Sequence, residues 1–311
     1  MEDLGTLFQS LITTDVTKTT HRDTYPAISS SRPALKQTGR TVLVTGGGTG
    51  VGFSIARSFI RASAHTVIII SRRSDVLASA SAILQQEAKS AGTNTRVITY
   101  TCDVVNKTEV EALWDGFAAQ GITIDVFVAN AAKFSEPNTI FELGADEVWS
   151  QIEVNAKAPL YFAEKFYAQK GDKQKFIVNV TSQVASMTGH AGVAARPAYV
   201  LSKMTGTVLF QVIAQNVSPE KLQVINFHPG VIYNSTWEKM GIPRELFDND
   251  DLCGDFAVWA TTKEAEFLHG RYVWASWDVQ ELSTGEIRKR IDEDFYFLRA
   301  TVAGLNGAFL A

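Results

Sequence analysis

The feature that most constrains the fold of this chain is the alternation of short apolar runs with longer stretches of helical character. The apolar runs have the length of strands and lie at Val42–Val44, Val67–Ile70, Val97–Tyr100, Ile124–Val128, Phe176–Val180, Val224–Phe227 and Tyr272–Trp274. The helical stretches between them are Val51–Ala62, Val76–Ala91, Lys107–Ala119, Asp146–Gln169, Ala198–Val217 and Cys253–Ala260. Continuous apolar strands separated by helices are typical of a parallel sheet covered on both faces. The sequence therefore predicts an α/β fold, a single doubly wound domain with a seven-stranded, mostly parallel sheet.

Two segments depart from this alternation. Residues 1–39 are rich in Ser and Thr, and they predict an N-terminal arm that lies over the domain or over a neighbouring subunit. Residues 40–311 then form the domain. Within the arm, four apolar residues share one helical stripe and predict a short docking helix: Leu4, Leu7, Phe8 and Leu11. Residues 233–251 mix apolar and charged side chains and predict a lid over the substrate.

The composition argues against several classes of partner. Hydrophobic residues make up 45% and charged residues 20% of the 311 positions, as in an ordinary soluble globular protein. The formal net charge is −4 and no run of Lys and Arg occurs, which argues against nucleic acid or an anionic membrane surface as a partner. No apolar run is long enough to cross a bilayer, so no membrane span is predicted.

The cysteines and the first residues bear on the compartment. Cys102 and Cys253 are too few for a disulfide framework and lack the spacing of metal ligands. The opening Met1-Glu2-Asp3 lacks the cationic start of a secretory signal. We therefore expect a cytoplasmic protein without a metal site.

A glycine-rich turn follows the first apolar run. Val42–Val44 leads into Thr45–Gly52, and a helical stretch follows, which is the strand–turn–helix unit that binds phosphate in a Rossmann-type domain. Gly46 allows the tight turn, Gly50 lets the backbone approach a pyrophosphate, and Gly52 lets the helix pack close to the sheet. The helix start adds unpaired N–H groups for an anion. A purely structural turn is the alternative. The residues expected to hold the phosphates are Gly46, Thr49, Gly50, Val51 and Gly52.

The end of the second apolar run indicates which dinucleotide is bound. An NAD site places an acidic residue there for the ribose hydroxyl, whereas an arginine accommodates a 2′-phosphate. The chain has Ser71-Arg72-Arg73 at this point, with no carboxylate. The planar guanidinium of Arg72 suits phosphate oxygens. We therefore predict NADP(H) as the cofactor, against the alternative of two arginines on a solvated surface loop.

A candidate proton donor lies in a later helical stretch. Tyr199 precedes Lys203 by one helical turn, so both side chains project from the same face. A nearby cation favours the phenolate and lowers the pKa of a phenol, which is ordinarily about 10. Ser182 closes the strand Phe176–Val180, where catalytic groups of parallel sheets gather. A nucleotide site beside such a donor predicts hydride transfer coupled to proton transfer.

These residues together resemble the classical short-chain dehydrogenase/reductase family over roughly residues 40–280. The resemblance is carried by Thr45–Gly52, Asp103-Val104, Ala129-Asn130-Ala131-Ala132, Val154-Asn155, Ser182, Tyr199, Lys203 and Pro229-Gly230. It implies that Ser182 orients the substrate oxygen and that Tyr199 gives or takes its proton. Lys203 would lower the pKa of the tyrosine and hold the nicotinamide ribose, and Asn155 would support a water relay.

The resemblance also implies further cofactor contacts and an assembly. The cofactor contacts expected beyond the glycine turn are Arg72, Asp103, Val104, Asn130, Tyr199, Lys203, Pro229, Gly230 and Ile232. The long apolar helices of residues 147–166 and 198–217 would supply the subunit contact of a homodimer or homotetramer. Two more segments, Thr20–Pro26 and Gly270–Asp278, are similar to a fungal branch of the family that often acts on secondary metabolites.

The chain departs from the family pattern at three places, one of which is Asn234, where the family has a Thr after Pro229-Gly230. Ala132 stands where the family usually has glycine, next to the matching Asn130. The stretch from Ser182 to Tyr199 is longer than the family commonly shows, with the extra residues within Met187–Arg196. Ser186 is the alternative serine in a shorter register. We favour Ser182 because it directly follows the strand.

Apolar residues around the expected site indicate the substrate class. Those expected at the pocket mouth are Val184, Met187, Val193, Tyr233, Trp237 and Met240. They predict an NADPH-dependent oxidoreductase that interconverts a ketone and a secondary alcohol on a bulky lipophilic substrate, such as a polyketide or terpenoid. A non-redox isomerase or cyclase on the same scaffold, and a nucleotide-binding regulator without turnover, are the alternatives.

Overall fold

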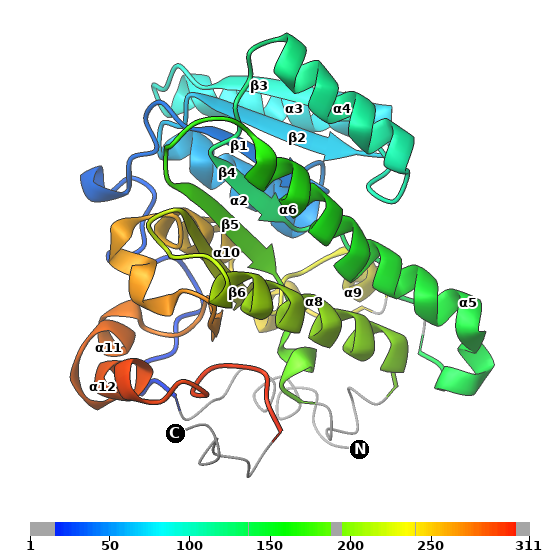
Figure 1. Ribbon diagram of the computed structural model, residues 1–311, viewed down its shortest axis with the longest axis vertical. Helices are drawn as coiled ribbons and strands as arrows, with labels where there is room; N and C mark the ends of the chain where they lie inside the picture. The colour runs from blue at the N-terminus through cyan, green and yellow to red at the C-terminus, as the bar shows by residue number, and fades with distance from the viewer. Residues whose placement is uncertain (1–15, 136, 188–194, 240, 303–311) are drawn as a thin grey trace.

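A computed structural model of the protein describes residues 16–135, 137–187, 195–239 and 241–302 (Figure 1). The strands are β1 Thr41–Thr45, β2 Thr66–Ser71, β3 Arg96–Thr101, β4 Val126–Ala129, β5 Lys175–Val180, β6 Leu222–His228 and β7 Tyr272–Trp274. They form one seven-stranded sheet in the order β3-β2-β1-β4-β5-β6-β7, and each pairing in it is parallel. The predicted doubly wound sheet is confirmed, and it is wholly rather than mostly parallel across these strands.

Helices cover both faces of the sheet. The α-helices are α2 Gly50–Arg61, α3 Ser74–Ser90, α4 Lys107–Ala119, α5 Ile140–Ile152, α6 Ala158–Ala168, α8 Pro197–Gln215, α9 Ser235–Lys239, α10 Asp250–Trp259, α11 Val279–Ser283 and α12 Gly285–Glu293. The 3₁₀ turns are η1 Pro33–Leu35, η3 Gln183–Ala185, η4 Arg244–Leu246 and η5 Lys263–Leu268, and η2 Glu153–Lys157 is a π-helical turn.

The two faces of the sheet bury two separate apolar clusters. On one face, α2, α3 and α10 pack so that Ile55 and Leu77 lie with Val44 of β1. On the other face, α4, α6 and α8 pack, and Phe162 and Phe210 are fully or almost fully buried there. Neighbouring residues of a strand point to opposite faces, so β1 contributes to both clusters. Because helices cover both faces of the sheet, both sides of each strand are apolar, and the strands appear in the sequence as continuous apolar runs.

The predicted helix Asp146–Gln169 is wrong as a single helix. The structure has α5, the π-helical turn η2 and α6 in succession, and Figure 1 shows them as one long diagonal run. The helix begins earlier than predicted because Thr139 and Glu142 form a reciprocal capping box at its start. The π turn adds one residue to the helical ladder, which is common at functional sites. It carries Asn155, whose side chain is buried.

The order of the strands fixes where a ligand can bind. β1 lies between β2 and β4, so the chain winds outward in opposite directions from this point. In open parallel sheets, ligands bind beyond the carboxyl ends of the strands at such a reversal. The turns that follow β1, β2, β3 and β4 therefore meet at one edge of the sheet.

The predicted arm and lid both contact this core. Tyr25, Ile28 and Leu35, which precede β1, are buried in the cluster on the α2 side of the sheet. The lid segment contains α9 and η4, and a bridge between Ile232 and Asp248 brings its two ends together. The predicted docking helix at Leu4–Leu11 lies outside the described residues. Within the described ranges, no helix has both the length and the apolarity needed to cross a membrane.

Candidate active site

The glycine turn after β1 is packed so closely that it leaves little room for side chains, as Gly46 and Gly52 illustrate. Gly46 has a φ of +66°, and its N–H donates to the carbonyl of Ile70 at 2.8 Å. A Cβ on Gly52 would lie 2.4 Å from Nδ2 of Asn130 and 2.5 Å from the carbonyl oxygen of Gly46. These distances are shorter than any van der Waals contact, so α2 approaches the turn as closely as it does only because residue 52 is glycine.

The start of α2 is open. Thr49 is the N-cap residue, and its side chain makes no capping hydrogen bond. Gly50 has a φ of +54°, and a Cβ there would meet no atom within 4 Å. The first turn of α2 contains no acidic residue. The first N–H groups of a helix have no partner within the helix, so this end can receive an anion.

Asn130 joins the carboxyl ends of β1 and β4. Its Nδ2 donates to the carbonyl of Thr45 at 2.8 Å and to that of Gly46 at 3.3 Å. Its backbone N–H donates to Oγ1 of Thr45 at 3.0 Å. The Asn130 side chain therefore fixes the backbone of the glycine turn, because its hydrogen bonds are made to the carbonyls of that turn.

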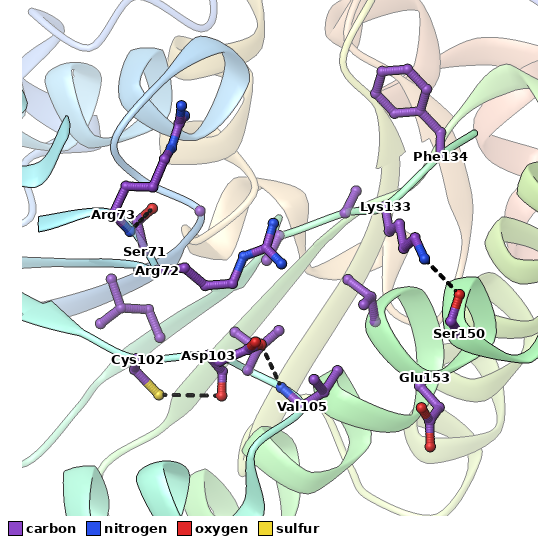
Figure 2. A pocket seen from close by; sticks show the side chains of 16 residues that line it. Ser71, Arg72, Arg73, Cys102, Asp103, Val105, Lys133, Phe134, Ser150 and Glu153 are labelled. Atoms are coloured by element: carbon purple, nitrogen blue, oxygen red, sulfur yellow. Dashed lines mark hydrogen bonds between the residues drawn. The ribbon is translucent and has the colours of Figure 1, made fainter. Parts of the chain in front are cut away.

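A cleft of about 510 Å³ opens beyond these strand ends (Figure 2). Its lining includes the predicted residues Gly46, Arg72, Asp103 and Val104. Figure 2 shows the guanidinium of Arg72 reaching into the middle of the cleft above Asp103, whereas the side chain of Arg73 points away from Asp103. The backbone around Asp103 is fixed, because its N–H donates to Glu109 and its Oδ1 accepts from the N–H of Val105. Thus the cleft has a cation at one wall and a fixed carboxylate opposite.

Asn155 connects this cleft with the later helix α8. Its Oδ1 accepts from the N–H of Lys133 and its Nδ2 donates to the carbonyl of Lys133, both at 2.8 Å. The same Nδ2 donates to Oγ of Ser202 at 2.8 Å. Its own carbonyl oxygen would lie 2.7 Å from a Cβ on Gly206, so α8 packs directly against the π turn.

Ser182, Tyr199 and Lys203 come together at the end of β5. A side-chain hydrogen bond joins Ser182 and Tyr199. The Nζ of Lys203 donates to the carbonyl of Val180 at 2.8 Å and lies 5.9 Å from the centre of the Tyr199 ring. Ser186, the alternative serine, donates to the carbonyl of Gln183. The geometry thus pairs the tyrosine with Ser182.

Burial sets the pKa values of this cluster. It raises the pKa of the Tyr199 phenol, and the hydrogen bond with Ser182 and the charge of Arg196 oppose this effect. Burial lowers the pKa of Lys203 to about 8. The structure here differs from the sequence expectation, in which the charge of Lys203 lowers the tyrosine pKa. The physical reason is that desolvation disfavours both charged forms, and the cation that opposes it at Tyr199 is Arg196.

Phe134 and Arg196 were not predicted from the sequence, and they border the tyrosine. The ring of Phe134 lines the cleft and meets the Tyr199 ring edge-on, with centroids 6.0 Å apart. The guanidinium of Arg196 lies 5.5 Å from the Phe134 ring centre and donates to the carbonyl of Ser135. Arg196 precedes Tyr199 by three residues, and this helical spacing is the signal that could have identified it.

Lys133 was also missed, although it directly follows the Asn130 segment. Its Nζ donates to Oε2 of Glu147 and Oγ of Ser150, both at 2.7 Å, as Figure 2 shows for Ser150. Lys133 and Ser150 both line the cleft. The lysine therefore braces the cleft wall against α5.

Pro229, Gly230 and Ile232 lie at the end of β6, outside the cleft just described. Gly230 has a φ of +98°, and a Cβ there would lie 2.6 Å from Oδ2 of Asp248. The same carboxylate oxygen accepts from the N–H of Val231 at 2.8 Å. The loop is thus held by a residue from the far end of the lid, which no short sequence motif reveals.

Comparisons with known proteins bear on the family and on the fold. The sequence profile described as short chain dehydrogenase matches residues 40–242. A protein of Aspergillus aculeatus, named short chain dehydrogenase/reductase AacuD, is 31% identical over 283 residues, covering 91% of this chain and 94% of its own.

Two solved structures share the fold at low identity. The RhlG/NADP active-site complex of Pseudomonas aeruginosa has a TM-score of 0.68 and 16% identity, covering 78% of this chain and 97% of its own. The second is LugOII, described as a promiscuous reductase that catalyses keto-reduction at C1 during lugdunomycin biosynthesis. It has a TM-score of 0.64 and 20% identity, covering 78% of this chain and 97% of its own.

The matched profile runs from the residue before β1 into the lid, and the likeness to the Aspergillus protein extends over most of the chain. The predicted resemblance, including its fungal character, is confirmed. This chain belongs to the short-chain dehydrogenase/reductase family, a family of oxidoreductases that use a nicotinamide cofactor.

Proposed function

We propose that this protein is an NADPH-dependent oxidoreductase that interconverts a ketone and a secondary alcohol on a bulky lipophilic substrate. One observation carries the proposal. Ser182, Tyr199 and Lys203 meet at the carboxyl end of β5, and Phe134 connects Tyr199 with the cleft that contains Arg72. A proton donor thereby lies beside a site suited to a dinucleotide.

The residues present fit NADP(H). The glycine turn leaves room for phosphate at Gly50, and the start of α2 offers N–H groups there. Arg72 is exposed in the cleft and can receive a 2′-phosphate with its planar guanidinium. Asp103 and Val104 line the same cleft, where an adenine would lie by family resemblance. Lys203 and the Pro229–Ile232 loop are the proposed partners of the nicotinamide end.

The chain's own residues handle the proton. Because burial raises its pKa, the Tyr199 phenol is neutral at physiological pH and can donate a proton to a carbonyl oxygen during reduction. Ser182, hydrogen-bonded to the phenol, orients that oxygen. Lys203 and Asn155 support return of a proton to Tyr199, Asn155 through a water relay. When bound, the nicotinamide supplies or accepts the hydride.

An apolar lid supports the choice of a lipophilic substrate. Tyr233 and Trp237 pack on Phe247, with ring centroids 5.1 and 5.5 Å apart. Val184 and Met187, both partly exposed, follow Ser182. Predicted lining residues Val193 and Met240 lie outside the described residues. A polyketide- or terpenoid-like ketone is the substrate class we propose, in keeping with the keto-reduction named for LugOII.

The proposal includes a location and an assembly. Cys102 and Cys253 are both buried free thiols, which suits a reducing, cytoplasmic compartment. Apolar side chains stay exposed on α5, α6 and α8, among them Trp149, Leu160 and Val212. A second copy of the chain is the proposed partner of this surface, as a homodimer or homotetramer.

The test combines cofactor binding with turnover. We expect purified protein to bind NADPH more tightly than NADH and to consume NADPH when bulky lipophilic ketones are added. Tyr199→Phe should still bind NADPH and lose roughly 10²- to 10⁴-fold in kcat, because it lacks the proton donor. Turnover of small charged acids alone would contradict the substrate class. Tight NADPH binding with no oxidation across the panel would favour the isomerase or cyclase alternative.

A further inference from the structure

The segment Thr20–Pro26, which the proposed reaction does not use, is bound to the chain just after β7. Thr20 forms an antiparallel bridge with Trp277, and the N–H of His21 donates to the carbonyl of Ser276 at 2.7 Å. The Tyr25 hydroxyl donates to the carbonyl of Trp277 and accepts from the N–H of Val279, both at 3.0 Å. The two segments that resemble the fungal branch therefore contact each other directly.

His21 strengthens this attachment. Its ring stacks on Tyr25 with centroids 3.6 Å apart, and its Nε2 lies 2.8 Å from Oδ2 of Asp278. Glu281 accepts from the N–H groups of Lys18 and Thr19 at 2.7 and 3.0 Å. The backbone of the arm is thereby held on both sides of Arg22.

From this fixed position, the arm reaches the end of the lid. The Nε of Arg22 donates to Oδ1 of Asp248 at 3.2 Å, and the carbonyl of Arg22 accepts from the N–H of Asn249 at 2.7 Å. Thr24 donates to Oδ2 of Asp255 in α10 at 2.6 Å. The arm is therefore attached to α10 of the core and also to Asp248 and Asn249, near the C-terminal end of the lid.

Asp248 links the arm to the loop after β6. Its Oδ2 accepts from the N–H of Val231 at 2.8 Å, and its own N–H donates to the carbonyl of Val231 at 2.9 Å. The side chain is only 3% exposed, whereas that of Arg22 is 42% exposed. One carboxylate oxygen thus binds the arm and the other binds the loop, and Gly230 leaves the space that this requires.

We infer that Arg22 and Asp248 are positioning residues, which hold the Pro229–Ile232 loop in the conformation that receives the nicotinamide end of the cofactor. The cofactor part of this inference rests on the proposed function. Arg22 orients the buried carboxylate, and the carboxylate fixes the loop and closes the base of the lid. The arm thereby contributes to cofactor binding without touching the cofactor.

The test compares Arg22→Gln and Asp248→Asn with Arg32→Gln. Arg32 is a matched control, because it belongs to the same arm and pairs with Glu264 at 2.6 Å, away from the loop. In cofactor-free protein, amide hydrogen exchange in residues 229–248 should be faster in the first two variants and unchanged in the control. Arg22→Lys keeps a charge that can reach Asp248 and should restore slow exchange. Unchanged exchange in both Arg22→Gln and Asp248→Asn would overturn the inference.

Cofactor binding provides the second readout. Loss of a charge-assisted hydrogen bond should raise the NADPH Kd and KM of Arg22→Gln by about tenfold, with kcat changed much less. Arg32→Gln should bind as wild type. Faster loop exchange with unchanged NADPH affinity would overturn the positioning role. A wild-type protein that binds neither NADPH nor NADH would overturn the proposed function itself, and the exchange result would still show whether the arm holds the loop.

Discussion

Burial changes the pKa values of Tyr199 and Lys203 in opposite directions, and in both cases it favours the uncharged side chain. A neutral phenol is the form needed to protonate a carbonyl oxygen, so the raised pKa suits reduction. Arg196 supplies a positive charge that opposes the effect of burial on the pKa of Tyr199. Ser182 is the polar group that contacts the phenol directly.

The lowered pKa of Lys203 predicts a pH-dependent stability. Its folded-state pKa of about 8 lies below the ordinary value of 10.5, so the unfolded chain holds the proton more tightly. This contribution to the free energy of unfolding therefore rises between about pH 8 and pH 10.5 and is lost as pH falls through 8. We would measure the free energy of unfolding of wild type and of Lys203→Met with urea. The wild-type value minus the variant value should rise by about 3 kcal/mol over this interval. A pH-independent difference would contradict the assignment.

Arg72 predicts the choice of dinucleotide. Arg72→Gln should weaken NADPH binding by about tenfold, because a charge-assisted hydrogen bond to the 2′-phosphate is lost. NADH binding should change less than the NADPH affinity. Arg96→Gln is the matched control, since Arg96 is an exposed residue at the start of β3, at the opposite edge of the sheet from the cleft. Equal losses for both nucleotides in a titration would argue against a 2′-phosphate contact.

The residues of the glycine turn and the group of Ser182, Tyr199 and Lys203 could be predicted, whereas Phe134 and Arg196 beside Tyr199 could not. Gly46 and Gly52 follow from local backbone geometry, which a short motif records. Phe134 and Arg196 meet only because two segments far apart in the chain fold together. Desolvation depends on the folded structure, so the expectation that Lys203 lowers the pKa of Tyr199 rests on charge alone.

At the scale of elements, β1, α2 and β4 interlock at the glycine turn. α2 contacts the turn through Gly52, and Asn130 at the end of β4 fills the remaining space. The close packing of β1, α2 and β4 therefore depends on the absence of a side chain at residue 52.

This interlock predicts the effect of adding a methyl group. Gly52→Ala should destabilise the protein by about 1–3 kcal/mol, because the new Cβ overlaps Asn130 and the carbonyl of Gly46. Gly116→Ala in α4 is the control, since its Cβ would meet only the end of the Gln120 side chain at 4.0 Å. That change should be neutral or stabilise by about 0.5–1 kcal/mol. Denaturant titration of both variants checks this, and equal stabilities would refute the interlock.

Strands were easier to predict than the segment that carries Asn155. All seven apolar runs became strands, because burial on both faces leaves a continuous apolar signal. The π turn η2 has no such signal, since it depends on the contacts of Asn155 with Lys133 and on close packing against Gly206. The arm's contact with the lid depends on side chains more than two hundred positions apart, such as Arg22 and Asp248.

At the scale of the whole molecule, one surface stands out as apolar. Leu201, Val208 and Val212 lie on one side of α8 with exposed fractions of 38–46%, and Trp149 on α5 is 64% exposed. Figure 1 shows α8 alongside the run of α5 and α6. Clustered exposed apolar side chains of this kind mark contact surfaces between proteins.

The assembly can be tested through this surface. Wild type should elute as a dimer or tetramer in size exclusion with light scattering, and Val208→Glu should shift it to a smaller species. A buried, unpaired carboxylate would be costly at such an interface. Ile83→Glu is the control, because Ile83 is 56% exposed on α3, beyond these helices. A monomeric wild type, or dissociation by both variants alike, would contradict the proposed contact.

The most direct test of the proposed chemistry follows the hydride itself. NADPH carrying deuterium at the transferable C4 position would be incubated with a bulky lipophilic ketone that the enzyme consumes. We predict one deuterium on the carbinol carbon of the alcohol product by mass spectrometry, and no product with Tyr199→Phe over the same time. Conversion of the substrate without deuterium uptake or NADPH loss would contradict the oxidoreductase mechanism.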